Sequence, residues 1–314
     1  MAVKDATILN LKRIATPKEA GSVIGDLVEA KRPSFNNEVI AYDEDTGELV
    51  AAVINLPHNQ NIMDARNAVQ GMAFSKMGRA NNYASDSKTF GWAPRRPVIG
   101  REGCSYSGTA RDTPDIEDAL ERLADECYNI LEEFAPDIIR QDREATAQVL
   151  DEWRIGEGKL WTSGVVNDTA RLPYHRDNFN FPAYSAMPVF RHKAKGGYLH
   201  LPEYGVCLPC RDSTVAYFKG KELVHGVTPI TPTGPGGYRY SIVYYALRGM
   251  KDCLTHAKEL EYSQRRRSER ELDMARRIAA GDTAIPGYKF KNEPNDPESC
   301  AEAAEMHNTP KVAE

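Results

Sequence analysis

The sequence predicts an α+β protein with an all-β core covered by helices. Between residues 160 and 247, short runs rich in β-branched and aromatic residues alternate with Gly, Pro, Asn and Asp, which is typical of a β-sandwich or barrel. An amphipathic helical pattern precedes this block at 114–153, and a highly charged helical pattern follows it at 251–280. Helices of the first kind most often cover one face of a sheet.

The composition is that of an ordinary globular protein. The 314 residues are 41% hydrophobic and 27% charged, and this length suits one large domain or two small ones. The polar end at 292–314 is predicted to be a disordered tail. We expect a single domain at 1–291, made of an N-terminal α/β extension at 1–110, a helical buttress at 114–153, a β core at 160–248 and a C-terminal helix at 251–281.

The N-terminal third mixes both kinds of element. Residues 1–30 read as a short strand followed by a helix, in which Pro17 takes an early helical position. The run EVIAYDEDTGELVAAVINL at 38–56 has two apolar segments around a turn sequence and predicts a β-hairpin. A short helix is expected at 64–71. The Asn-, Gly- and Pro-rich stretch at 80–107 is predicted to form loops and short strands.

Two helices are predicted in the buttress. Apolar residues recur there at spacings of three and four, which is one face of a helix. Pro136 is expected to break this helix, and a second is expected from Asp142 to Trp153. Gly281 is predicted to cap the C-terminal helix. The residues that form the apolar face are Ile116, Leu120, Leu123, Cys127 and Ile130.

Charge and cysteine content bear on partners and compartment. The net charge is −5 and the pI about 5.9, so any DNA contact must come from local basic clusters. Two clusters qualify, Arg95/Arg96/Arg101 and the arginines of 265–277. The sequence has no secretory pattern at its start and no apolar run of membrane-spanning length. Its six cysteines are too few for a disulfide scaffold, so we expect a cytoplasmic protein that spans no membrane.

The clearest chemical pattern lies in LPYHRDNFN. It places His175 and Asp177 two positions apart, and residues i and i+2 of an extended chain point to the same face. A second histidine, His225, lies in the apolar run KELVHGVTP. Two imidazoles and one carboxylate form the facial triad that binds non-haem Fe(II) and leaves three coordination positions open. These residues are therefore the predicted metal ligands.

An arginine and a serine on the last predicted strand extend this pattern. Arg239 and Ser241 lie in GGYRYSIVYYAL, and strand alternation places them on one face. The open positions of the metal suit O₂ and a bidentate 2-oxoacid, and a dicarboxylate such as 2-oxoglutarate needs a cation at its far end. A guanidinium pairs with carboxylate bidentately and stays charged. We therefore expect Arg239 to bind the cosubstrate and Ser241 to add a hydrogen bond.

This prediction depends on the combination of the HxD pair, the second histidine and the arginine, because each of them alone also occurs by chance. An isolated HxD is common, and the chain has seven histidines. Here the HxD follows a strand, the second histidine precedes a glycine, and an arginine follows on a strand, all within one β-rich block. The alternatives are a surface position for Arg239 and a ligand role for His200. The CxxC formed by Cys207 and Cys210 favours buried thiols over zinc, because no second CxxC accompanies it.

At these residues the chain resembles the Fe(II)/2-oxoglutarate dioxygenases, and within them the TET/JBP branch. HRDNFN is similar to the His-x-Asp-x-x-Asn pattern of TET proteins, with Asn180 at the asparagine, and GGYLHLPEYGV resembles the strand that follows. The resemblance covers roughly 89–247. It implies a double-stranded β-helix of the jelly-roll, cupin-like type, with Fe(II), 2-oxoglutarate and O₂ as cofactors. The chain lacks the cysteine-rich region and long insert of TET proteins, so it resembles a compact phage or bacterial member.

The same resemblance implies oxidation of the 5-methyl group of a pyrimidine in DNA, with the asparagine reading a flipped base. A flipped base needs aromatic faces and an edge reader. We expect Tyr174, Phe179 and Asn180 to contact the base, and Arg95 and Arg96 to contact phosphate, with salt-dependent binding. An asparagine amide both donates and accepts, so either 5-methylcytosine or thymine remains open.

Two other functions are compatible with the same residues. The oxygenase core could act on a protein side chain or a small molecule instead of DNA. Alternatively, the chain could be a non-enzymatic, cupin-like binding module with a structural metal. A binding module would not turn over 2-oxoglutarate, whereas an oxygenase would. An oxygenase that acts on DNA would depend on methylated DNA, whereas one that acts on a protein or small molecule would not. The sequence does not indicate an oligomeric state.

Overall fold

A computed structural model describes residues 3, 6–78, 83–96 and 101–282. The predicted tail at 292–314 therefore lies outside the described residues. Contacts divide the chain into two compact units. The larger unit holds the chain up to Pro94 together with Ser105–Cys253, and the smaller unit holds Arg95–Cys104 together with the chain from Leu254 onward.

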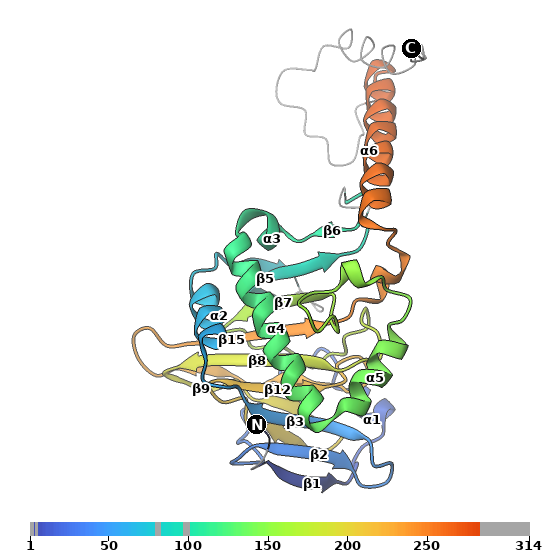
Figure 1. The fold of residues 1–314 in the computed structure, drawn as a ribbon. Coiled ribbons are helices and arrows are strands. Elements are labelled where there is room, and N and C mark those ends of the chain that lie inside the picture. The colour runs from blue at the N-terminus through green and yellow to red at the C-terminus, as the bar shows by residue number, and fades with distance from the viewer. Residues whose placement is uncertain (1–2, 4–5, 79–82, 97–100, 283–314) are drawn as a thin grey trace. The chain divides into compact units, whose positions relative to one another are not determined.

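The larger unit is built on one wide sheet (Figure 1), which has ten strands within the described residues. Its first two strands are parallel, and the other pairs of the sheet are antiparallel. β1 ends the sheet at one edge, next to the hairpin of β2 and β3, and β4 ends it at the other. The strands in order are β1 (Thr7–Leu11), β2 (Val39–Asp43), β3 (Leu49–Asn55), β12 (Thr214–Phe218), β8 (Ser185–His192), β15 (Tyr238–Tyr245), β7 (Ser163–Asp168), β5 (Ala84–Ala93) and β4 (Ser75–Gly78), with β6 (Ser105–Tyr106) beside β5.

A second, smaller sheet packs on one face of the wide one. Inward residues of β8 and β12, such as Met187 and Phe218, share a buried cluster with Leu199, Leu208 and Val227 of the small sheet. Two facing antiparallel sheets around one apolar core form a double-stranded β-helix, as expected. The small sheet contains β10 (Leu199–Leu201), β11 (Val206–Leu208) and β13 (Gly226–Val227), and a separate ribbon contains β9 (Ala194–Gly196) and β14 (Ile230–Pro232).

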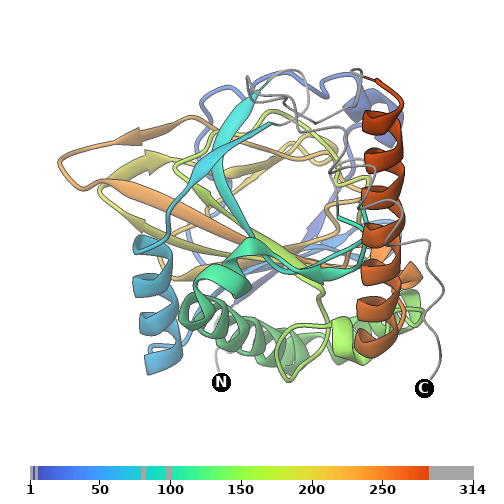
Figure 2. The ribbon, with the colours of Figure 1, turned by 90° about the horizontal axis from the view of Figure 1, so that it is seen from above.

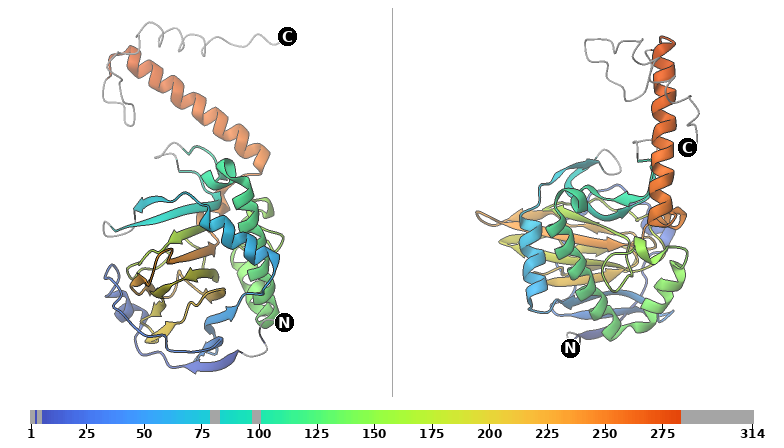
Figure 3. Two further views of the ribbon diagram at one scale, coloured as in Figure 1. Left: turned by 90° about the vertical axis from the view of Figure 1, so that its left-hand side faces the viewer. Right: turned by 45° about the horizontal axis from the view of Figure 1, so that its top comes forward.

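Helices cover the other face of the wide sheet, where α2 and α4 lie side by side (Figures 2 and 3). The alternate residues of the strands point to them. Tyr244 of β15 donates its hydroxyl proton to the Leu120 carbonyl at 2.7 Å, and Tyr217 of β12 donates to the Cys127 carbonyl at 2.7 Å. The helices of this unit are α1 (Pro17–Gly21), α2 (Gln60–Gln70), α3 (Gly108–Asp112), α4 (Pro114–Phe134) and α5 (Pro136–Ala145), with 3₁₀ turns η3 (Asp151–Trp153) and η4 (Arg248–Asp252).

The sequence predictions of the N-terminal hairpin and of the helix after it are confirmed, but two others are wrong. β5 is a ten-residue strand where loops and short strands were expected. Two of its buried positions are Ser85 and Ser87. The strand therefore lacks the alternating apolar residues by which a strand is recognised in a sequence. The second buttress helix begins at Pro136 and ends at Ala145 instead of running over 142–153. Proline suits a first helical turn, because the N–H that it lacks would have no partner there.

The smaller unit contains α6 (His256–Ala279). Glu259 is its buried residue and accepts hydrogen bonds from Arg95 Nε at 2.6 Å and from the Cys104 N–H at 2.7 Å. Just past the helix, Gly281 has a φ of +79°, the left-handed conformation expected of a glycine there. Among the helices that the structure describes, none has the length and apolar character needed to cross a bilayer.

Candidate metal centre and its cavity

Backbone pairing brings the three predicted ligands together. His175 and His225 form an antiparallel bridge, with the His175 N–H donating at 2.9 Å and the His225 N–H at 3.0 Å to each other's carbonyl. The N–H of Asp177 donates to the Gly220 carbonyl at 2.9 Å. The segment between β7 and β8 is thereby fixed to the segment between β12 and β13.

The side chains of these residues converge on one point. His175 Nε2 lies 3.7 Å from Asp177 Oδ1, and His225 Nε2 lies 3.9 Å from Asp177 Oδ2. The three ligating atoms lie within 4.8 Å of one another. Two Nε2 atoms and one carboxylate oxygen at this spacing fit a single divalent cation on one face of its coordination sphere. The arrangement predicted from the sequence is therefore present.

Hydrogen bonds to backbone carbonyls orient both imidazole rings. His175 Nδ1 lies 2.8 Å from the Pro173 carbonyl, and His225 Nδ1 lies 3.0 Å from the Leu223 carbonyl. A carbonyl only accepts, so each Nδ1 carries a proton, which leaves Nε2 as the nitrogen that is available to a metal. Burial, and then the neighbouring His175 ring, lower the pKa of His225 to about 4. This ring is therefore neutral at pH 7.

The triad lies in a cavity of about 400 Å³, a size typical of small-molecule sites. Phe179, Asn180 and Ser241, all predicted site residues, also line this cavity. Asn180 is buried, whereas Phe179 is 80% exposed. Tyr174 does not line the cavity, contrary to expectation. Its ring is buried and its hydroxyl lies 2.8 Å from Nδ1 of His200, so it packs behind the ligand segment.

Arg239 is fully buried on β15. Alternation puts it on the face of Ser241 and Val243, both of which line the cavity. None of its three guanidinium nitrogens has a hydrogen-bond partner among the described residues. Burial lowers the pKa of Arg239, and the nearby Cys210 thiol opposes this. A buried cation without an acceptor is costly, so this position is suited to an anionic ligand.

Comparison with known proteins gives a fold and no sequence family. No family model and no curated protein matches the chain. The solved structure described as NgTET1 in complex with 5mC DNA is 16% identical, with a TM-score of 0.54 over 83% of this chain and 91% of that one. The chain shares the fold of this TET protein. An oxidoreductase of the 2OG-Fe(II) oxygenase family from Burkholderia pseudomallei is also similar, at 12% identity and a TM-score of 0.42 over 77% of this chain and 99% of that one.

Asn167 on β7 is a cavity residue that was not predicted from the sequence. This residue is buried, lines the cavity, and lies between two serines. Its Oδ1 accepts from Ser87 Oγ at 2.9 Å, and its Nδ2 lies 3.5 Å from Ser241 Oγ. A polar rung thus crosses β5, β7 and β15 beside the metal centre. An asparagine inside the strand SGVVND was the only available signal.

The two arginines expected to contact phosphate belong to the smaller unit. Arg95 pairs with Glu259 and lies over the Tyr262 ring, 4.5 Å from its centroid. Arg96 is exposed and pairs through its backbone with Arg101. A phosphate contact by these residues stays a prediction.

Proposed function

We propose that this chain is an Fe(II)- and 2-oxoglutarate-dependent dioxygenase that hydroxylates the 5-methyl group of a pyrimidine in DNA. One observation carries the oxygenase part. A His-Asp-His triad lies in a cavity wall whose last strand also buries a guanidinium with no acceptor among the described residues.

The residues fit the metal through their donor chemistry. His175, Asp177 and His225 would hold Fe(II) through two neutral imidazoles and one carboxylate, a set typical of this ion. When bound, iron supplies the activation of O₂ that is coupled to the oxidation of 2-oxoglutarate. The three residues line the cavity, which provides space for further ligands.

Arg239 would bind the far carboxylate of 2-oxoglutarate. Guanidinium and carboxylate form two parallel hydrogen bonds, and a site shielded from water makes the pair stronger. Ser241 lies two residues further along the strand and would add a hydrogen bond, with Asn167 orienting its hydroxyl. The cosubstrate would thus run from the metal along the face of β15 that carries Ser241, towards Arg239, which is buried and does not itself line the cavity.

DNA as the substrate is supported by the TET likeness and by the size of the cavity. A methyl group in a duplex cannot reach a buried metal, so the base has to leave the stack, at a cost of a few kcal/mol. Asn180 would contact the edge of the base with its amide, and the exposed ring of Phe179 would lie beside the DNA stack that the base leaves. Both residues line the cavity within a few positions of the ligand Asp177.

Incubation of the protein with DNA tests this proposal. Substrates containing 5-methylcytosine, or thymine as the only methylated base, are supplied with iron, ascorbate and 2-oxoglutarate. We expect nucleosides that gain the mass of one oxygen atom, with an equal amount of succinate. Asp177→Ala removes one ligand and should abolish both products.

Two other results would contradict the proposal at different levels. Succinate formed with a peptide or small molecule, and not with DNA, would keep the oxygenase and replace its substrate. Bound iron without succinate under any of these conditions would favour a binding module of cupin-like shape.

A further inference from the structure

Arg176 lies between two proposed ligands, His175 and Asp177, and its side chain fixes their segment. Its Nη2 donates to the Pro17 carbonyl at 2.7 Å, and its Nε donates to the Glu222 carbonyl at 3.0 Å. Nη2 also lies 3.3 Å from Oε1 of Glu203, whose side chain is only 1% exposed.

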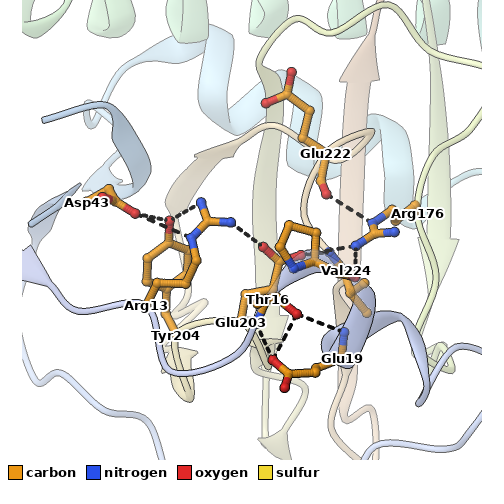
Figure 4. A network of polar contacts seen from close by, with 10 residues as sticks. Arg13, Thr16, Glu19, Asp43, Arg176, Glu203, Tyr204, Glu222 and Val224 are labelled. Carbon is orange, nitrogen blue, oxygen red and sulfur yellow. Dashed lines mark hydrogen bonds and ion pairs between the residues drawn. The ribbon is translucent and has the colours of Figure 1, made fainter. Parts of the chain in front are cut away.

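The same oxygen of Glu203 reaches the segment of the third ligand. Oε1 accepts the N–H of Val224, at 3.3 Å, and Val224 directly precedes His225. One buried carboxylate oxygen therefore contacts a direct neighbour of each of the three ligands (Figure 4). Glu203 itself lies between β10 and β11, and β10 pairs with β13, which begins directly after His225. The side chain of Glu203 therefore adds to a backbone link with the segment of His225 and extends it to the segment of His175 and Asp177.

The other half of Glu203 is held by the N-terminal segment. Oε2 accepts from Arg13 Nη1 at 3.2 Å, and the backbone carbonyl of Glu203 accepts the N–H groups of Ile14 at 2.8 Å and Ala15 at 3.2 Å. The next residue starts α1 with a capping box, in which Thr16 and Glu19 bond each other's backbone N–H. The segment between β1 and α1 is therefore part of the support of the metal centre.

We propose that Glu203 is a positioning residue that holds both ligand segments at metal-binding distance, a role that rests on the metal site proposed above. Its carboxylate is needed because it must accept from Arg176, Arg13 and a backbone N–H at once. The neutral amide of a glutamine at this position would direct its NH₂ group at one of the arginines, which are donors themselves, so one hydrogen bond would be lost. Residues that hydrogen-bond to metal ligands typically change metal affinity by roughly 10–100-fold when they are replaced, and Glu203 acts on all three ligands through the residues beside them.

Titration of the metal-free protein with Co(II), followed by visible absorption, tests this role. We expect Glu203→Gln to weaken Co(II) binding by roughly 10–100-fold and to change the absorption band, because the ligand geometry relaxes. Asp43→Asn is the matched control. Asp43 is also buried, accepts from the Tyr204 hydroxyl at 2.6 Å and pairs with Arg13, but it lies at the opposite end of the network from Arg176 (Figure 4).

The control should lose stability and keep the affinity and spectrum of the wild type. Unchanged Co(II) binding in Glu203→Gln, or an equal loss in Asp43→Asn, would overturn the proposal. Should Glu203→Gln not fold, Arg176→Met removes the other end of the contact and decides in the same way. A wild-type protein that binds no Co(II) would overturn the proposed metal site, and this role with it.

Discussion

Gly220 leaves the space that Asp177 occupies. A Cβ atom at Gly220 would lie 2.5 Å from Asp177 Oδ2 and 3.4 Å from His225 Cε1. Cβ atoms in proteins do not approach other atoms to 2.5 Å, so one of the two atoms would have to move. Asp177 Oδ2 is the end of a rotatable side chain and would move more easily than the backbone. A ligand oxygen is therefore held in place partly by the absence of a side chain on a neighbouring segment.

Gly220→Ala should separate metal binding from folding. We expect the carboxylate of Asp177 to rotate away, so that Co(II) affinity falls while the melting temperature of the metal-free protein changes little. Gly78→Ala is the control, because its Cβ would meet nothing within 4 Å. A variant that binds Co(II) as tightly as the wild type would show that the metal ligands do not depend on this space.

Arg239→Met tests the buried guanidinium. It removes an unpaired buried charge, so the protein without ligand should be as stable as the wild type or more stable. The wild type should gain about 2.7 kcal/mol from 2-oxoglutarate at 100 times its dissociation constant, and the variant should gain almost none. The measurement is thermal unfolding with and without 2-oxoglutarate. Equal stabilisation of both proteins would place the cosubstrate elsewhere.

The sequence predicted the metal triad because local rules determine most of it. His175 and Asp177 share a face through the i, i+2 geometry of extended chain, and the β-rich runs around His225 indicated the sheets that bring it near. Glu203 and Gly220 had no comparable signal, because their roles depend on contacts between segments far apart in the chain. Tyr174 does not line the cavity, because proximity in sequence to a ligand does not determine which way a ring points.

Glu117 on α4 makes stability depend on pH. Its side chain is buried, Oε1 accepts the Gly91 N–H at 2.5 Å, and Oε2 has no hydrogen-bond partner in the described part of the chain. Burial raises the pKa of Glu117 to about 7. The folded state therefore binds a proton that the unfolded state releases between pH 4.5 and 7, and this contribution to stability is lost as the pH rises through 7.

Glu117→Gln mimics the protonated side chain and should be more stable than the wild type at pH 8. The gain should vanish near pH 4 and reach about 3 kcal/mol at most, because burial raises the pKa of Glu117 from 4.5 to about 7. Urea unfolding at several pH values measures it, and Glu133→Gln, at an exposed position of the same helix, is the control. A difference that does not vary with pH would contradict a shifted pKa.

Phe179 should matter more for duplex DNA than for single strands. Its ring is 80% exposed beside the cavity. Its segment is nevertheless ordered, because its carbonyl accepts the Arg248 N–H at 2.9 Å and Asn180 pairs with Leu247. A base that leaves the stack opens a gap, and apolar side chains can fill such gaps.

Phe179→Ala should therefore reduce oxidation of duplex DNA by roughly tenfold or more, since unstacking costs a few kcal/mol, and should reduce oxidation of the same sequence as a single strand much less. The ratio of the two rates is the measurement, and Leu150→Ala, at another exposed apolar position, should leave it unchanged. An equal fall on both substrates would assign Phe179 to the base itself, because a contact inside the cavity is made whichever form of DNA delivers the base.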